Sequence, residues 1–124
     1  MNNTTSEPTV PAAINECHAF LLKKLSKEDL SAIKNCAFNK LCQWHFSFGR
    51  WIRNNWGLWA GGELKTHMES LGFTHPDDMS TVILESFWSN LNEQPYDLEE
   101  AANSYKEYWK MANNNCKMIE LTGP

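Results

Sequence analysis

The stretch THPDDMSTVILESFWSNL, residues 74–91, decides the fold because it has the pattern of a central helix. Pro76 suits the first helical position, and Asp77 and Asp78 place negative charge at the positive end of the helix dipole. The rest of the segment is apolar nearly all round and keeps one narrow polar stripe: Thr81, Glu85 and Ser89. A helix that is apolar on most of its faces is usually buried. We therefore predict a mostly buried helix over about 76–91.

A second long helix is predicted over about residues 39–55, and its end belongs to the stretch GRWIRNNWGLW, residues 49–59. Five apolar residues recur at helical spacing and are expected to face inward: Leu41, Trp44, Phe48, Trp51 and Ile52. Gly49 lies inside this helix, where glycine costs about 1 kcal/mol relative to alanine. That cost indicates that another backbone or side chain approaches closely at Gly49. Gly57 is expected to end the helix, and Gly61–Gly62 mark a turn.

Four further helices complete the prediction of an all-α fold, a compact single-domain bundle of five to six helices. Apolar residues at helical spacing place these helices over the approximate ranges 11–25, 26–36, 63–71 and 97–111. Several helix ends carry cap signals: Ser26, Gly72 followed by Phe73, Thr74 or His75, and Asp97 with Glu100. We expect a helical domain over 10–112, between a flexible N-terminal tail over 1–9 and a loose C-terminal tail over 113–124.

The stretch 49–59 combines three tryptophans with two arginines and two asparagines, which allows two interpretations. In the structural interpretation it is a rigid corner, where Arg53 pairs with Asp78 because a partly buried arginine needs a carboxylate. In the functional interpretation it is a recognition surface, because Trp and Arg are enriched among the residues that dominate protein interfaces. The candidate binding residues are Arg50, Arg53, Asn54, Trp56, Trp59, His75, Asp77 and Asp78.

Charge is distributed unevenly along the chain, whose net charge is −4. Residues 1–60 carry seven Lys/Arg and four Asp/Glu, a net charge of +3, whereas residues 61–124 carry four and eleven, a net charge of −7. An acidic half suits a basic protein partner, although ordinary solubility explains it as well. Nucleic-acid binding normally needs a basic face, so no nucleic-acid partner is expected.

The sequence contains few motifs that indicate catalysis, metal binding or cofactor binding. The cysteines at positions 17, 36, 42 and 116 form no CxxC pair, and without an export signal we expect reduced thiols in the cytoplasm. Cys42 and His45 have the spacing of metal ligands but lack a second pair, so no metal is predicted. The absence of a nucleophile motif and of a glycine-rich phosphate loop leaves no catalytic residue and no cofactor predicted. No apolar run is long enough to cross a bilayer, so no membrane association is expected.

Three segments resemble a family of small bacterial proteins of unknown function: WHFSFGRWIRNNWGLW at 44–59, LGFTHPDDMSTVILESFWSNLN at 71–92 and YKEYWK at 105–110. Members typically show four motifs, which fall here on His45–Phe46, Trp51–Trp59, His75–Ser80 and Glu16–Cys17. The resemblance spans about residues 10–110. Two departures are visible: Phe48 and Arg50 stand where smaller or aliphatic residues are expected, and Gly61–Gly62 replaces a Gly-Ser pair. The resemblance implies no activity that can be transferred to this chain.

The first functional prediction is a non-enzymatic, cytosolic protein-binding module, such as an immunity, antitoxin-like or regulatory protein with a basic protein partner. The alternative is a small-molecule or nucleotide-handling enzyme with an aromatic and arginine-lined pocket between the helix over 39–55 and the start of the central helix. In that enzyme Arg50 or Arg53 would bind an anion, and His45 or His75 would act as acid or base. A third prediction is self-association through the tryptophans, so the chain is expected to be a monomer or a homodimer.

Overall fold

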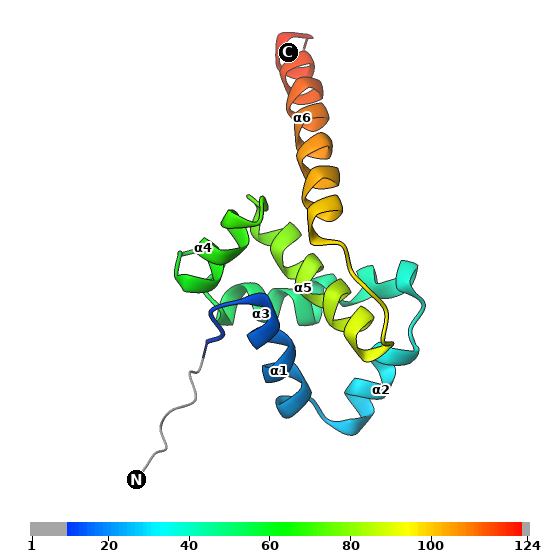
Figure 1. Cartoon of the computed structure of the whole chain (residues 1–124). Coiled ribbons are helices and arrows are strands. Elements are labelled where there is room, and N and C mark those ends of the chain that lie inside the picture. The colour runs from blue at the N-terminus through cyan, green and yellow to red at the C-terminus, as the bar shows by residue number, and fades with distance from the viewer. Residues whose placement is uncertain (1–9, 123–124) are drawn as a thin grey trace.

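The computed structural model describes residues 10–122, with side chains described over 10–112, and the chain forms an all-α domain (Figure 1). Its elements are, in chain order, α1 (Ile14–Lys24), α2 (Lys27–Asn35), η2 (Phe38–Trp44), η3 (His45–Gly49), α3 (Arg50–Asn55), α4 (Glu63–Ser70), α5 (Pro76–Leu91) and α6 (Leu98–Thr122). The residues that the structure describes contain no strand. The predicted fold class, a compact single-domain helical bundle, is confirmed.

Helix α5 is the centre of the bundle, because every other helical element of the described chain contacts it. Four of its apolar side chains have no exposed surface: Met79, Val82, Ile83 and Phe87. Burial of one such side chain contributes about 1.5–3 kcal/mol, so α5 supplies a large share of the stability of the core. The prediction of a buried central helix is confirmed, with Pro76 as its first residue. His75 occupies the N-cap position, but its side chain makes no capping hydrogen bond.

The segment predicted as one helix over 39–55 consists of three short elements of different helical type. η2 is a 3₁₀-helix, η3 is a π-turn, and only α3 is α-helical. The carbonyl of His45 accepts hydrogen bonds from the backbone N–H of Arg50, five residues later, and from the guanidinium of Arg53. Because both donors hydrogen-bond to this one carbonyl, they favour the π-turn over a regular α-helical turn.

The π-turn changes which side chains after it face the core, because it contains more residues than an α-helical turn. Trp51 was expected to face inward, but 42% of its surface is exposed. Leu41 and Ile52 are buried as predicted, whereas Trp44 and Phe48 are half-buried. The inward-facing stripe of this segment is therefore only partly as predicted.

Gly49 allows the close approach that its position indicated. A Cβ atom at Gly49 would lie 3.0 Å from Nη1 of Arg53 and 3.6 Å from Oγ of Ser80 on α5. A side chain at this position would displace the guanidinium of Arg53, so glycine keeps η3 in contact with both groups.

Three of the predicted helix caps are confirmed. Oγ of Ser26 accepts a hydrogen bond from the N–H of Asp29 at 3.1 Å. Oδ1 of Asp97 accepts one from the N–H of Glu100 at 3.0 Å. Gly72 has a φ of +108°, and the N–H of the next residue, Phe73, donates to the carbonyl of Met68 at 3.1 Å, which is the hydrogen bond of a Schellman motif.

Helix α6 extends out of the bundle and carries the C-terminal end of the chain away from it (Figure 1). We predicted that this helix ends near residue 111, whereas its backbone continues to Thr122. The asparagines of the run 113–115 each lower helix propensity by about 0.7 kcal/mol or less, which is too little to end the helix. The expected tail over 1–9 lies outside the described residues, and so do the side chains of the expected tail over 113–124. Among the described helices, none combines the length and the apolar character needed to cross a bilayer.

Two glycines with positive φ form a matched pair for a stability test. Gly72 and Gly61 have φ values of +108° and +112°. A Cβ at Gly72 would lie 3.1 Å from Cβ of Ala102 on α6, whereas a Cβ at Gly61 would meet nothing within 4 Å. We expect Gly72→Ala to lower the free energy of unfolding by about 1 kcal/mol or more beyond the effect of Gly61→Ala, because only the first crowds α6. Chemical denaturation measures both, and equal losses would contradict the packing of α6 on Gly72.

His18 joins α1 to α5. Its Nε2 lies 2.8 Å from Oγ of Ser86, and its ring centroid lies 5.9 Å from that of Phe87. Burial lowers the pKa of His18 below its ordinary value, because the charged imidazolium loses hydration at this interface. The folded chain therefore binds the proton of His18 less tightly than the unfolded chain does.

This difference in proton binding sets the sign of a pH dependence. The stability contributed by His18 is full above the pKa of an unfolded histidine, about 6.5, and is lost as the pH falls through the lower pKa of the folded state. We expect the advantage in melting temperature of the wild type over His18→Gln, which does not titrate, to shrink between about pH 7.5 and about pH 5. Other groups titrate in both proteins and cancel in the difference. A constant difference over this range would show that His18 is not desolvated.

Candidate functional site

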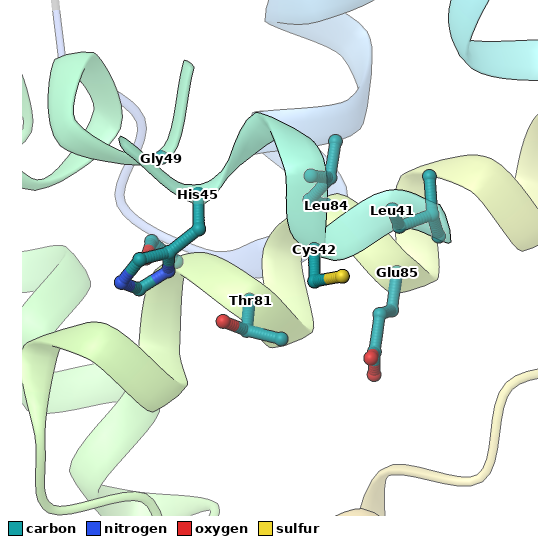
Figure 2. Close-up of a pocket in the computed structure, with 8 residues that line it drawn as sticks. Leu41, Cys42, His45, Gly49, Thr81, Leu84 and Glu85 are labelled. Atoms are coloured by element: carbon teal, nitrogen blue, oxygen red, sulfur yellow. The ribbon is translucent and has the colours of Figure 1, made fainter. Parts of the chain in front are cut away.

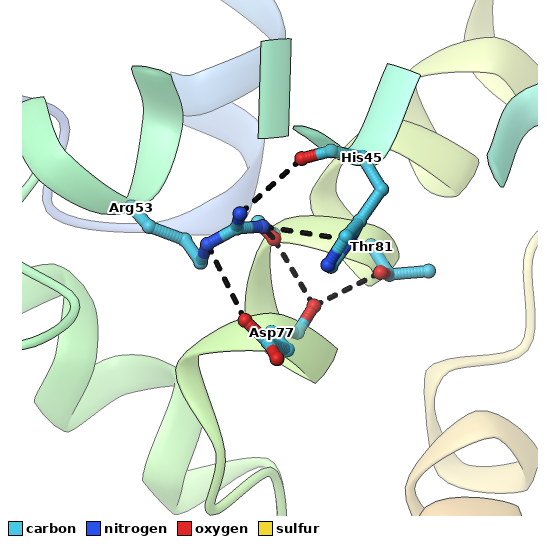
Figure 3. Close-up of polar contacts among 5 residues, drawn as sticks. His45, Arg53, Asp77 and Thr81 are labelled. Atoms are coloured by element: carbon cyan, nitrogen blue, oxygen red, sulfur yellow. Dashed lines mark hydrogen bonds and ion pairs between the residues drawn. The ribbon is translucent and has the colours of Figure 1, made fainter. Parts of the chain in front are cut away.

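Arg53 is buried where η3, α3 and α5 meet, with 5% of its surface exposed. Its Nη1 donates to Oγ of Ser80 at 2.8 Å, and its Nη2 donates to the carbonyl of His45 at 3.2 Å (Figure 3). Its Nε lies 3.4 Å from Oδ1 of Asp77, whose side chain is 55% exposed. Nδ1 of His45 lies 3.5 Å from Nη1 and accepts a hydrogen bond from it when that nitrogen is unprotonated. The guanidinium thus has partners for each of its three nitrogens, as a buried charge requires.

The predicted pairing of Arg53 with Asp78 is wrong, because the carboxylate beside Arg53 is that of Asp77. Consecutive residues of a helix point in different directions, so only one of the two aspartates can face α3. Ser80 reinforces the arrangement, since its hydroxyl donates to the carbonyl of Asp77 at 3.0 Å and keeps its lone pairs for Arg53. The network is a structural junction in which each of the three guanidinium nitrogens already has a partner.

Asp78 faces α6 instead. Nε1 of Trp109 donates to Oδ2 of Asp78 at 2.5 Å, and the ring of His75 stacks on Trp109 with the ring centroids 3.6 Å apart. Burial raises the pKa of Asp78, and the hydrogen bond from Trp109 opposes part of that rise. His75, Asp78 and Trp109 therefore fasten α6 to the start of α5.

The eight candidate binding residues do not form one site. Arg53 and Asp77 belong to one network, while His75 and Asp78 belong to the contact with α6. Trp56 lies in the core with 2% of its surface exposed. The three others are exposed: Arg50, Asn54 and Trp59. The sequence prediction thus combined residues that stabilise the fold with exposed residues that are accessible to a binding partner.

The structure adds an exposed groove that the sequence did not predict. This aromatic groove has a volume of about 470 Å³ and is lined by Phe20, Leu21, Lys24, Leu25, Phe48 and Trp51. It lies between α1 and the η3–α3 segment, and Trp51 is there because the π-turn places it outward. No helical periodicity of the sequence could indicate this, because regular spacing places Trp51 inside.

A smaller pocket of about 220 Å³ lies between the η2–η3 segment and α5 (Figure 2). Its polar lining comes from Cys42 and His45 on one side and from Ser80, Thr81 and Glu85 of α5 on the other. The alternative prediction placed a pocket at this boundary, but it expected aromatic and arginine side chains there. Thr81 and Glu85 belong to the polar stripe of the central helix, which was the signal available in the sequence.

Glu85 is the titratable group of α5 that borders this pocket. The hydroxyl of Tyr96 donates to its Oε1 at 2.6 Å. Burial raises the pKa of Glu85, and the hydrogen bond from Tyr96 opposes part of that rise. No three His, Cys, Asp or Glu side chains among the described residues gather closely enough to hold a metal ion.

The network around Arg53 leads to a prediction with three matched variants. Arg53→Lys loses the hydrogen bonds to Ser80 and to the carbonyl of His45, so we expect the free energy of unfolding to fall by about 2 kcal/mol. Asp77→Asn affects an exposed partner and is expected to cost about 1 kcal/mol or less. Arg50→Lys on the exposed face of α3 is the control, with a change of about 0.5 kcal/mol or less. If urea denaturation gave Arg53→Lys the stability of the control, the buried network would not hold the fold.

A protein family described as a domain of unknown function (DUF6794) matches residues 10–91. No curated protein and no solved structure matches the chain significantly. The matched segment includes α1 to α5, and therefore the Arg53 network, the aromatic groove and the smaller pocket. Because the match covers more than half of the chain, the protein belongs to the DUF6794 family of domains of unknown function.

Proposed function

We propose that this protein is a protein-binding module without enzymatic activity, and that its partner is a basic protein. The observation that carries the proposal is the exposure of Trp51, 42% of its surface, in the lining of the aromatic groove. Tryptophan is among the residues that supply most of the binding energy of protein interfaces. A groove beside it can receive an apolar side chain of the partner.

The rings around Trp51 support this role because they hold it in place. Its ring centroid lies 5.6 Å from that of Trp56, 6.4 Å from that of Phe20 and 6.4 Å from that of Phe48. Trp56 is itself buried in the core. A side chain that is already fixed loses little conformational entropy on binding, so more of its contact energy contributes to affinity.

Further exposed side chains of residues 46–59 have the composition of a binding surface. Phe46 and Trp59 are 73% and 57% exposed. Arg50 and Asn54 are exposed on α3 between them and offer hydrogen-bond donors. Aromatic area beside such donors is typical of the residues on which protein partners anchor.

The charge of the C-terminal half supports a basic partner. Residues 61–124 carry a net charge of −7, from four Lys/Arg and eleven Asp/Glu. A negative surface of this kind accelerates encounter with a positive partner and disfavours acidic ones. The concrete form of the proposal is a cytoplasmic immunity, antitoxin-like or regulatory protein of bacteria, acting as a monomer or a homodimer.

The alternative function, a small-molecule or nucleotide-handling enzyme, has weaker support. It would use the pocket of about 220 Å³, where His45 and Glu85 could act as acid and base. No Phe, Tyr or Trp side chain of the described residues lines that pocket, and the guanidinium of Arg53 is already bound to Ser80 and His45. An anionic substrate would therefore lack the predicted clamp.

An affinity experiment tests the proposal. The tagged full chain is used to capture partners from a native lysate, and the captured protein is then purified so that its affinity can be measured directly. We expect one dominant basic protein, and we expect Trp59→Ala and Arg50→Ala each to weaken its binding about ten-fold. Both variants change exposed side chains and should melt like the wild type.

The matched control is Tyr108→Ala, which removes another exposed aromatic side chain, on α6, that is 53% exposed. It should leave the affinity unchanged, because Tyr108 lies outside the segment 46–59. Capture of no partner, or equal weakening by the control, would contradict a binding surface formed by residues 46–59. A saturable effect of metabolites on the spectrum of His45 would then favour the pocket of about 220 Å³ as the functional site.

A further inference from the structure

A third hollow borders α5 and shares no lining residue with the aromatic groove. It has a volume of about 530 Å³ and is formed by η2, α5, the loop before α6 and α6 itself. We call it the acidic aromatic pocket and define it by Phe38, Glu85, Trp88, Tyr96, Glu100 and Tyr105. Glu85 also borders the pocket of about 220 Å³. The volume suits one small molecule or one long side chain.

Aromatic side chains from four parts of the chain contribute to this pocket. Phe38 and Trp88 meet edge to face with their ring centroids 5.3 Å apart, and Nε1 of Trp88 donates to the carbonyl of Cys36 at 2.8 Å. Tyr96 is held by its hydrogen bond to Glu85, and Tyr105 reaches the pocket from α6. Phe38 is 45% exposed although it is a large apolar side chain. The pocket therefore presents rings that are fixed and accessible.

The charges of the pocket are all negative. Glu85, Asp97 and Glu100 line it, and no Lys, Arg or His stands among its described lining residues. Tyr96 is the hydrogen-bond partner of Glu85 among the described residues, and that bond engages Oε1 only. Burial raises the pKa of Glu85, which means that its negative charge is incompletely compensated in the free protein. A positive group in the pocket would supply the missing compensation.

We infer that the acidic aromatic pocket binds an organic cation, an alkylammonium or guanidinium group on an apolar stem. Cations are attracted to the faces of aromatic rings, and the carboxylates of Glu85 and Glu100 supply the opposite charge. The apolar surface of the rings receives the stem. A bare metal ion fits less well, because it needs several oxygen ligands around one point and no three carboxylates of the described residues gather closely enough to supply them.

The cation could be a free amine or guanidine, or the end of a Lys or Arg side chain of a protein. Both sources offer the same chemistry to the pocket, and the experiment below separates them. The residues of this pocket differ from those of the proposed protein-binding surface, which are residues 46–59 and the lining of the aromatic groove. If the protein-binding surface proves inactive, the inference about the pocket still holds. If the pocket binds no cation, the proposal of a protein-binding surface still holds.

Titration of the isotope-labelled full chain by two-dimensional NMR tests the inference. The probes are butylammonium and butylguanidinium, with butanol as a neutral control of the same shape, and a capped peptide that carries one central arginine. We expect both cations to cause saturable shifts centred on Glu85, on Tyr96 and on the indole N–H of Trp88, while butanol at the same concentration causes none. A peptide that binds more tightly than the free cations identifies a protein side chain as the source, and equal binding identifies a small cation.

Three Glu→Gln variants identify which carboxylates contribute to cation binding. Glu85→Gln keeps an acceptor for Tyr96 and should weaken cation binding about ten-fold, which corresponds to 1.4 kcal/mol. Glu100→Gln should weaken it about three-fold, because Glu100 is exposed and its interaction is screened. Glu99→Gln is the matched control, since it removes the same charge from the neighbouring position without lining the pocket. Equal binding of butanol, shifts centred elsewhere, or equal effects of the variants at 99 and 100 would overturn the inference.

Discussion

The burial of the Arg53 guanidinium is the interaction on which the arrangement of the surface depends. A charged group is stable away from water only when its donors are satisfied, and here the partners come from η3 and α5. The carbonyl of His45 serves Arg53 and the backbone of Arg50 together, which stabilises the π-turn. Gly49 leaves the room that the guanidinium needs. Trp51 points outward as a consequence, and the aromatic groove exists because of it.

The two proposed binding sites differ in their chemistry and lie on different elements. The aromatic groove belongs to α1, η3 and α3, and Lys24 is the charged residue among its described lining. The acidic aromatic pocket belongs to η2, α5, the loop before α6 and α6, and the charged residues of its described lining are all carboxylates. The first suits an apolar side chain and the second suits a cationic one. A basic protein with an exposed apolar anchor has both, so the two proposals are compatible with one partner.

The sequence predicted those features that depend on residues close together in the chain. The central helix, the caps at Ser26 and Asp97 and the close approach at Gly49 follow from local spacing and propensity. The choice of Asp77 over Asp78 depends on how α3 meets α5, and the exposure of Trp51 depends on the π-turn, so neither follows from periodicity. The pockets depend on how several helices are arranged, so the sequence alone does not predict them. The sequence does show the polar stripe of α5. Its three members line them: Thr81 the smaller pocket, Ser89 the acidic aromatic pocket and Glu85 both.

The most direct test of this account is the solvent exposure of individual tryptophans, measured by fluorine NMR of the fluorotryptophan-labelled chain in light and heavy water. The resonances of Trp51 and Trp56 are assigned by single Trp→Phe substitutions. The account predicts a solvent isotope shift for Trp51, which is 42% exposed, and almost none for Trp56, which is 2% exposed. It also predicts that Arg53→Lys changes the resonance of Trp51, because the buried guanidinium holds the turn before it. A shielded Trp51, or a resonance that does not respond to Arg53→Lys, would contradict the claim that Arg53 builds this surface.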